Sequence, residues 1–274
     1  MSDETHNDLL ERFGEYLIEQ ELSESTRDVY LLSMRLFFER YDAATKANAV
    51  LWKRYLMESG LKPKTVNVRL NGYNKFVTME GRERDKVKTL KVHKDTAVSN
   101  VISQADYKKL CKGLKEDGNL KWYYIVRLMA STGVRVSELI RLKKSDFDRG
   151  YAEMFTKGKI RRIYIPESFR KEAKKHYAKL KPDDLLCISR YGEPMTTRNV
   201  AWNLQQFAKE YGIDKKVMHP HSFRHMFAIE FLKRNSNLSL LADVMGHSSI
   251  STTAIYTRLT KEQQTDAVNK TINW

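Results

Sequence analysis

Residues 219–225, near the C-terminal end, read HPHSFRH, and this stretch decides how the rest of the chain is interpreted. Three histidines and an arginine fall within seven residues, so a metal site, a helix start and part of an active site are all open. His221 and His225 have the i, i+4 spacing of helical zinc ligands. No glutamate lies between them, however, and the fixed charge of Arg224 would repel a dication. We expect no metal, and a helix cap near His221 after Pro220 stays an alternative.

The segments on either side add polar residues in a fixed order. Downstream, GHSSISTTAIY contains His247 and, nine residues later, Tyr256. Upstream, STGVRVSELIRL contains Arg135 two residues after a glycine and Glu138 three residues further on. Between them, two alternating segments flank KGK at residues 157–159, which is typical of a β-hairpin. In chain order the sequence has arginine, lysine, His-x-x-Arg, histidine and tyrosine.

These motifs resemble those of the tyrosine recombinases, or phage-type integrases, which include the Xer recombinases, Cre and the lambda integrase. HSFRH is similar to the family's H-x-L-R-H box, with Phe223 where leucine is usual. MGHSSISTTAIY is similar to its L-G-H-s-x-x-x-T-x-x-Y box, and TGVRVSELIRL to its first-arginine box, T-G-x-R-x-S-E-L. The boxes span residues 99–262 in the family's order. Each is weak alone, and together they are specific.

The resemblance implies a site-specific DNA recombinase that cleaves and rejoins strands through a 3′-phosphotyrosyl intermediate, with integration, excision or inversion as the outcome. Arg135 and Arg224 can each offer paired donors to the non-bridging phosphate oxygens. Tyr256 is the predicted nucleophile. Lys157 in the hairpin turn is the predicted general acid, with Lys159 as a competitor. The scheme needs no cofactor, neither ATP nor a metal, and the sequence has no G-x-x-x-x-G-K-[ST] loop.

The remaining site residues have supporting roles in this interpretation. His221 lies one helical turn from Arg224, so both can face one phosphate, and His247 would add a hydrogen bond. Which histidine donates and which accepts the tyrosine proton stays open. Glu138 resembles a family carboxylate that supports the first arginine. His225 is expected to pack or hydrogen-bond locally.

The charge balance independently favours a polyanionic partner. The chain has 49 Lys+Arg against 34 Asp+Glu, a formal net charge of +15, and most of the excess lies beyond residue 94. Such an excess favours nucleic acid over a membrane surface, since no basic amphipathic anchor stands out. Solvated helix and strand faces are the alternative for individual cations. The candidates for phosphate contact are Lys64, Arg69, Lys75, Lys159, Arg161 and Arg162.

The fold is expected to be mainly α-helical with a small antiparallel β-sheet. Residues 1–81 have three-and-four apolar spacing, and Pro63 fits the first turn of a helix, which predicts four short helices. The resemblance implies that these form the family's core-binding domain. Residues 82–98 are polar and predict a linker. Residues 99–274 would be the catalytic domain, whose tail, with Val268, Ile272 and Trp274, docks on a neighbouring protomer.

The expected partner is double-stranded DNA with a short inverted-repeat core site. Strand exchange on two such sites implies a homotetramer, with a monomer when free. No membrane span or signal peptide is evident, and Cys111 and Cys187 are expected to be reduced buried thiols, so a cytoplasmic protein at the nucleoid is expected. Two alternatives are a type IB topoisomerase-like enzyme that relaxes DNA and a DNA-binding regulator with relic catalytic boxes.

Overall fold

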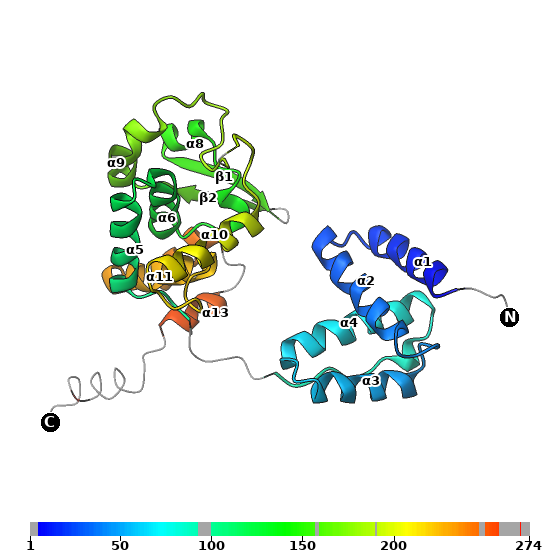
Figure 1. Ribbon diagram of the computed structural model, residues 1–274. Coiled ribbons are helices and arrows are strands. Elements are labelled where there is room, and N and C mark those ends of the chain that lie inside the picture. Colours follow the sequence, from blue (N-terminus) through cyan, green and yellow to red (C-terminus); the bar gives the residue numbers. More distant parts are fainter. Residues whose placement is uncertain are drawn as a thin grey trace. The chain divides into compact units, whose positions relative to one another are not determined.

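A computed structural model of the chain divides it into two compact units, residues 1–94 and 95–274 (Figure 1). The structure describes residues 5–92, 100–156, 159–189, 191–246, 250–257 and 269. In this part of the chain, every helix is too short or too polar to cross a membrane.

The N-terminal unit is built from helices whose starts are set by local capping. Thr5 begins the first helix by accepting a hydrogen bond from the backbone of Asp8 at 3.3 Å, and Thr45 caps the third in the same way. Pro63 occupies the first turn of the fourth, as predicted. The elements are α1 (His6–Glu19), α2 (Glu24–Phe38), α3 (Lys46–Glu58), α4 (Pro63–Met79) and the 3₁₀ helix η1 (Glu83–Asp85).

Aromatic side chains fill the core of this unit. Phe37 on α2 meets Trp52 on α3 edge-on, with ring centroids 5.1 Å apart, and Phe13 on α1 meets Phe76 on α4 at 5.4 Å. All four rings are buried. Edge-to-face pairs add about 0.5–1.5 kcal/mol beyond the burial of their area. The four predicted helices are therefore present and share one core.

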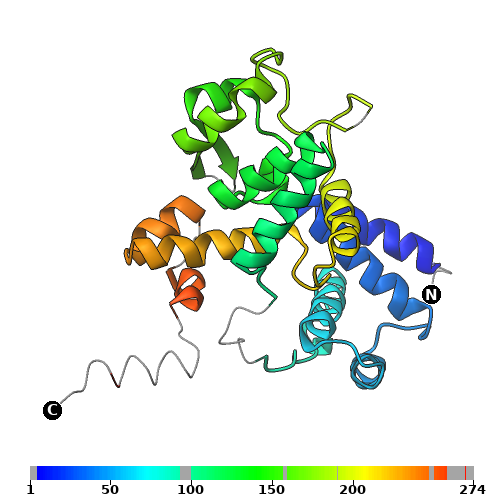
Figure 2. The same cartoon turned by 60° about the vertical axis from the view of Figure 1, so that its left-hand side comes forward.

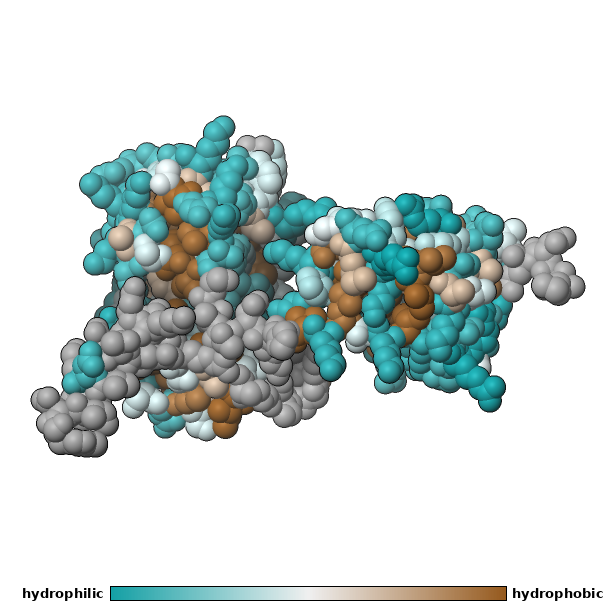
Figure 3. All heavy atoms as spheres, turned by 90° about the horizontal axis from the view of Figure 1, so that it is seen from below, coloured by the Kyte–Doolittle hydropathy of each residue, from teal (hydrophilic) through white to brown (hydrophobic). Residues whose placement is uncertain are grey.

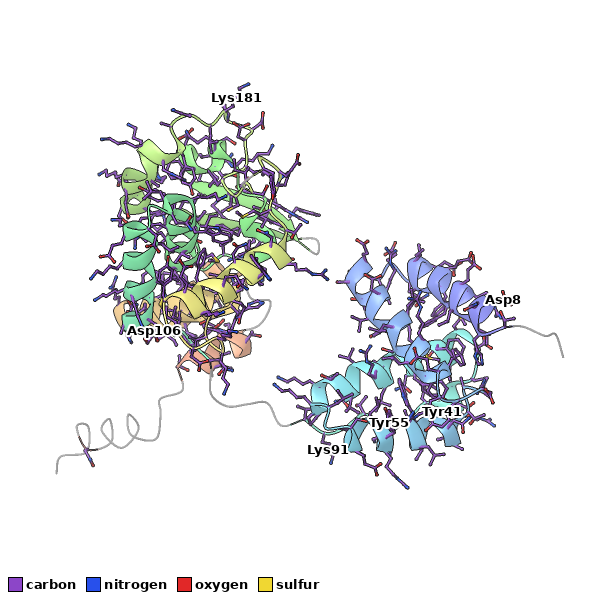
Figure 4. All side chains as sticks on the ribbon, in the orientation of Figure 1. Asp8, Tyr41, Tyr55, Lys91, Asp106 and Lys181 are labelled. Atoms are coloured by element: carbon purple, nitrogen blue, oxygen red, sulfur yellow. The ribbon has the colours of Figure 1, made fainter. Side chains whose placement is uncertain are left out.

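The segment after α4 packs back onto the N-terminal unit. Val87 is 7% exposed, and its backbone N–H donates to the amide oxygen of Asn74 at 2.9 Å. The backbone N–H of Leu90 donates to Asn67 at 2.7 Å. Val87 and Leu90, within the predicted linker of residues 82–98, therefore pack on this unit, and Lys91 lies at its edge (Figure 4). The segment lacks apolar periodicity because two asparagines of α4 satisfy its backbone.

The second unit is mainly helical with one two-stranded sheet, as predicted. Strands β1 and β2 pair in antiparallel register, from Tyr151 opposite Tyr164 to Thr156 opposite Lys159. The elements are α5 (Gln104–Glu116), α6 (Leu120–Thr132), α7 (Val136–Leu139), α8 (Lys144–Arg149), β1 (Tyr151–Thr156), β2 (Lys159–Tyr164), α9 (Glu167–Tyr177), α10 (Thr197–Glu210), α11 (Pro220–Arg234), α12 (Leu238–Met245), α13 (Ile250–Thr253) and the 3₁₀ helix η2 (Ala254–Tyr256).

Helix α6 runs through the core of the second unit, with Ile125 and Leu128 fully buried. Phe223 on α11 is also fully buried in this core, so the departure from the family's leucine fills space rather than altering the site. Helices α11 and α12 lie side by side, with α13 and η2 packed near them (Figures 1 and 2). This arrangement brings the ends of α6, α11 and α12 and the strand β2 together.

Candidate active site

Arg135 stands at a sharp corner between two helices. Helix α6 ends at Gly133, whose φ of 59° is left-handed, and α7 begins directly after Arg135. The backbone N–H of Arg135 donates to Oε2 of Glu138 at 2.9 Å, and its Nη1 donates to Oε1 at 3.0 Å. One carboxylate therefore caps the short helix and holds the arginine, which is the contact that the sequence suggested for Glu138.

Arg161 on β2 also belongs to this cluster. Its Nη1 pairs with Oε2 of Glu138, and its Nη2 donates to the carbonyl of Val244 at 3.2 Å. The residue is 7% exposed, and its Nε has no hydrogen-bond partner among the described residues. Strand alternation turns Arg161 inward and leaves its neighbour Arg162 exposed, so a phosphate contact of Arg161, which stays a prediction, would have to be made within this cluster.

Arg224 is held in the same region by the start of α11. The ring of His219 caps this helix by accepting from the backbone of Ser222 at 3.2 Å, so the cap is His219 and not His221. Arg224 is 4% exposed and donates to the carbonyls of Gly133 at 2.6 Å and Met245 at 2.5 Å.

Gly246 closes the cluster from the end of α12. Its φ of 61° is left-handed, and its carbonyl accepts from Nη2 of Arg135 at 2.8 Å. A Cβ atom at this position would collide with the side chain of Arg161. The glycine of the predicted histidine box is thus required both by its backbone conformation and by the close approach of an arginine.

The cluster carries an excess of positive charge. Glu138 is the carboxylate that pairs with both Arg135 and Arg161, and although burial opposes it, these arginines lower the pKa of Glu138. Burial, together with the charges of Arg161 and Arg135, lowers the pKa of Arg224 to about 9, which still leaves it charged at neutral pH. The site thus contains three arginines and one carboxylate, and this excess of positive charge would attract an anion.

Tyr256 lies on η2 beside α11. Its hydroxyl is 2.7 Å from Nδ1 of His225, and the two ring centroids are 5.6 Å apart. Burial raises the pKa of Tyr256, while the charge of Arg224 opposes the shift. His225 was expected only to pack or bond locally, so its contact with the predicted nucleophile was missed. The sequence placed the two residues 31 positions apart and carried no signal for this pairing.

His221 lies one turn before His225, with their ring centroids 6.4 Å apart. Partial burial and the charges of Arg224, His219 and Arg135 lower the pKa of His221, which keeps it neutral at neutral pH. Within the described ranges, no group of three or more His, Cys, Asp or Glu residues could hold a metal ion. Lys157, His247, the side chain of Lys159 and the tail after Thr257, apart from Asn269, lie outside the described residues.

The family is decided by comparison with known proteins. The family model described as "Phage integrase family" matches residues 100–263. The chain belongs to the phage integrase family. It is 30% identical to tyrosine recombinase XerA of Pyrococcus furiosus, over 96% of this chain and 94% of that protein. It is 28% identical to tyrosine recombinase XerC of Listeria innocua, over 93% and 94%. The predicted family and enzyme class, a tyrosine recombinase, are confirmed.

Solved structures of phage integrase relatives share the fold. The Tn1549 transposon integrase in complex with transposon right end DNA superposes with a TM-score of 0.72 at 19% identity, covering 97% of this chain and 99% of that one. The XerH site-specific recombinase bound to difH substrate gives 0.73 at 16%, covering 99% and 98%. The predicted fold class, mainly α with a small sheet, is confirmed.

The other described cations that the sequence assigned to DNA contact are divided between the N-terminal unit and the β-hairpin of the second unit. Lys64 on α4 is exposed. Arg69 is half-buried and donates to Ser33 at 3.3 Å, and Lys75 donates to Gln20 at 2.8 Å. Arg162 is exposed on β2 and pairs with Glu153 across the hairpin at 2.5 Å.

Proposed function

We propose that the protein is a site-specific DNA recombinase in which Tyr256 cuts one strand and holds it as a 3′-phosphotyrosine. The observation that carries the proposal is the cluster in which Arg135 and Arg161 pair with Glu138 and Arg224 is held by the carbonyls of Gly133 and Met245, with Tyr256 packed beside α11. The excess positive charge of this cluster is complementary to a phosphodiester. The hydroxyl of Tyr256 lies beside α11, the helix that carries Arg224.

The arginines supply the electrostatic part of the reaction. Charge grows on the non-bridging phosphate oxygens as the tyrosine attacks, and fixed donors stabilise that charge without reorganising. The side chain of Arg135 is 32% exposed, which leaves it accessible to a phosphate, whereas Arg224 is only 4% exposed. Loss of either guanidinium is expected to slow cleavage by about 10²–10³-fold.

The covalent step exchanges one phosphate ester for another. The bond between Oη of Tyr256 and phosphorus forms, and the bond between phosphorus and the 5′-oxygen breaks. Lys157 gives a proton to the leaving 5′-oxygen, while Tyr256 loses its own proton. His221 and His247 hydrogen-bond to the phosphate. A second 5′-hydroxyl then attacks the phosphotyrosine and rejoins the strand, so no external energy source is used.

The N-terminal unit is proposed to hold the DNA as the core-binding domain. A shallow hollow of about 240 Å³ between α2 and α4 is lined by Lys64, Arg69, Val29, Leu32 and Val68. The cations suit phosphates and the apolar side chains suit thymine methyl groups. Apolar patches interrupt the polar surface of this unit (Figure 3). Lys75 and Lys159 with Arg162 add further phosphate contacts.

Assembly follows from the chemistry. Exchange between two duplexes with two cuts on each implies a homotetramer on two inverted-repeat core sites, formed from free monomers. The catalytic domain after the linker is proposed to pass its tail, with Val268, Ile272 and Trp274, to a neighbouring protomer. A DNA substrate would place the protein at the nucleoid in the cytoplasm. The outcome on DNA is integration, excision or inversion.

The experiment is covalent trapping on nicked DNA from the protein's own genomic flanks, in the presence of EDTA. An SDS-resistant protein–DNA band is expected for the wild type and for Tyr164→Phe, an exposed tyrosine on β2, and none is expected for Tyr256→Phe. Exchanged strand partners in the products support recombination. A changed linking number without exchange would overturn it in favour of a topoisomerase, and salt-dependent binding without cleavage on every flank in favour of a regulator.

A further inference from the structure

Tyr256 and His225 make a direct hydrogen bond in the absence of DNA. The phenol oxygen lies 2.7 Å from Nδ1 of the imidazole, and the ring planes are inclined by 52°. Both side chains are half-buried, so solvent competes only partly for the bond. The contact joins η2 to α11 and fixes the position of the hydroxyl relative to the helix that carries Arg224.

The protonation states of the two groups leave Nδ1 able to accept a hydrogen bond from the phenol. Burial and the charges of His221, His219 and Arg224 lower the pKa of His225 to about 4, and these are the titratable groups that act on it alongside Tyr256. A neutral imidazole has one free lone pair, whereas an imidazolium has none. Since burial also raises the pKa of the phenol, Tyr256 keeps its proton, and it donates that proton to Nδ1 in the tautomer whose imidazole proton lies on Nε2.

We propose that His225 orients the Tyr256 hydroxyl and accepts its proton as the tyrosine attacks the phosphate. This inference rests on the proposed function. The O–H bond of Tyr256 breaks, Nδ1–H forms, the oxygen bonds to phosphorus, and the 5′-oxygen leaves with the proton from Lys157. Rejoining reverses each step, so His225 returns the proton to Tyr256 and is neutral again.

The position of His221 favours this division of labour. His221 is exposed on the first turn of α11, one turn before His225, and Arg224 is one of the charges that act on it. It is therefore placed for a phosphate oxygen, while His225 touches the attacking oxygen itself. The negative charge of a bound phosphodiester would raise the pKa of His225 and so make it a better proton acceptor.

The decisive variant is His225→Asn, because the amide oxygen takes the place of Nδ1 and keeps an acceptor without basicity. Single-turnover cleavage of nicked DNA should slow by about 10²–10⁴-fold at neutral pH. The rate of the variant should then rise about tenfold per pH unit above neutrality, as solvent must remove the phenol proton, while the wild-type rate stays nearly flat. His6→Asn, in the N-terminal unit, is the control and should match the wild type.

A second substrate separates the acceptor from the general acid. In DNA with sulfur in place of the bridging 5′-oxygen, the leaving group needs no proton, so Lys157→Ala should cleave it well. His225→Asn should remain slow on the same DNA. Rescue of His225→Asn by this substrate, or an equal loss of rate at every pH, would overturn the proposal. Absence of a covalent adduct with the wild type would instead overturn the proposed function.

A measurement without DNA tests the hydrogen bond by itself. In ¹⁵N-histidine-labelled protein, His225 should carry its proton on Nε2, and the Nδ1 resonance should shift when Tyr256 is replaced in Tyr256→Phe. A proton on Nδ1 in the wild-type protein would exclude His225 as the acceptor, whatever the DNA experiments show.

Discussion

Replacing Glu138 by alanine should unfold the catalytic unit at a much lower temperature. The carboxylate is 7% exposed and accepts from the backbone and side chain of Arg135 and from Arg161, which is itself 6% exposed. Removing it leaves Arg161 buried without its counter-charge. Breaking a buried ion pair by deleting one partner costs about 3–5 kcal/mol.

This magnitude converts to a clear shift in the unfolding temperature. For a unit the size of residues 95–274, each kcal/mol shifts Tm by about 2–4 °C, so Glu138→Ala should lower Tm by about 6–20 °C. Calorimetry on the full chain measures the shift. Glu153→Ala removes the exposed partner of Arg162 on the same hairpin and should leave Tm unchanged.

A second substitution tests whether the unpaired arginine causes the loss. Arg161→Met in the Glu138→Ala background removes the buried charge and should recover part of the lost stability. Because Arg161 and Arg135 lower the pKa of Glu138, the carboxylate stabilises the fold above its ordinary pKa of 4.5, and this contribution is lost as the pH falls through the lower folded value. A Glu138→Ala protein that unfolds within about 1 kcal/mol of the wild type would refute the reasoning.

Three further outcomes are expected. Gly246→Ala should lower both Tm and cleavage, because the residue has a left-handed φ and its new Cβ would meet an arginine, and unchanged values would contradict that packing. Lys64→Ala should weaken DNA binding similarly on all sequences and reduce the slope of log K against log salt by about 1, measured by fluorescence anisotropy. Glu172→Gln should destabilise the unit at pH 7, since the ion pair of Glu172 with Arg127 at 2.6 Å joins α6 to α9. Urea unfolding should show the difference from wild type shrink below pH 4.5 and vanish as the pH falls through the lower pKa of Glu172 in the folded protein.

The hairpin shows what could be read from the sequence and what could not. Alternating residues around KGK predicted two strands, and the strands are present. Adjacent arginines on a strand must face opposite sides, but the sequence did not say which side is inward. The structure turns Arg161 toward Glu138 and leaves Arg162 exposed, because packing of β2 against α12 decides which of the two side chains faces inward. The inward position of Arg161 could not be read from the sequence for this reason.

The other two differences also depend on tertiary contacts. The packing of Val87 and Leu90 could not be read from the sequence, because asparagines of α4 and not apolar periodicity hold these residues. His225 was overlooked because its partner Tyr256 follows after the ends of α11, α12 and α13, and their approach depends on how α12 returns the chain to α11. Motif residues such as Arg135 and Glu138 were identifiable because they are three positions apart on one helix start.

The arginines of the site are held by hydrogen bonds to neutral carbonyls, but their charge is only partly balanced, and this difference bears on catalysis. The arginines donate to the carbonyls of Gly133, Val244, Met245 and Gly246, which are dipoles and carry no net charge. Glu138 neutralises one of the three cations, so the described cluster keeps an excess of two. A phosphodiester brings one negative charge, and the pentavalent transition state brings a second. In the proposed reaction the cluster would therefore interact more strongly with the transition state than with the bound substrate, and interactions of that kind accelerate the chemical step.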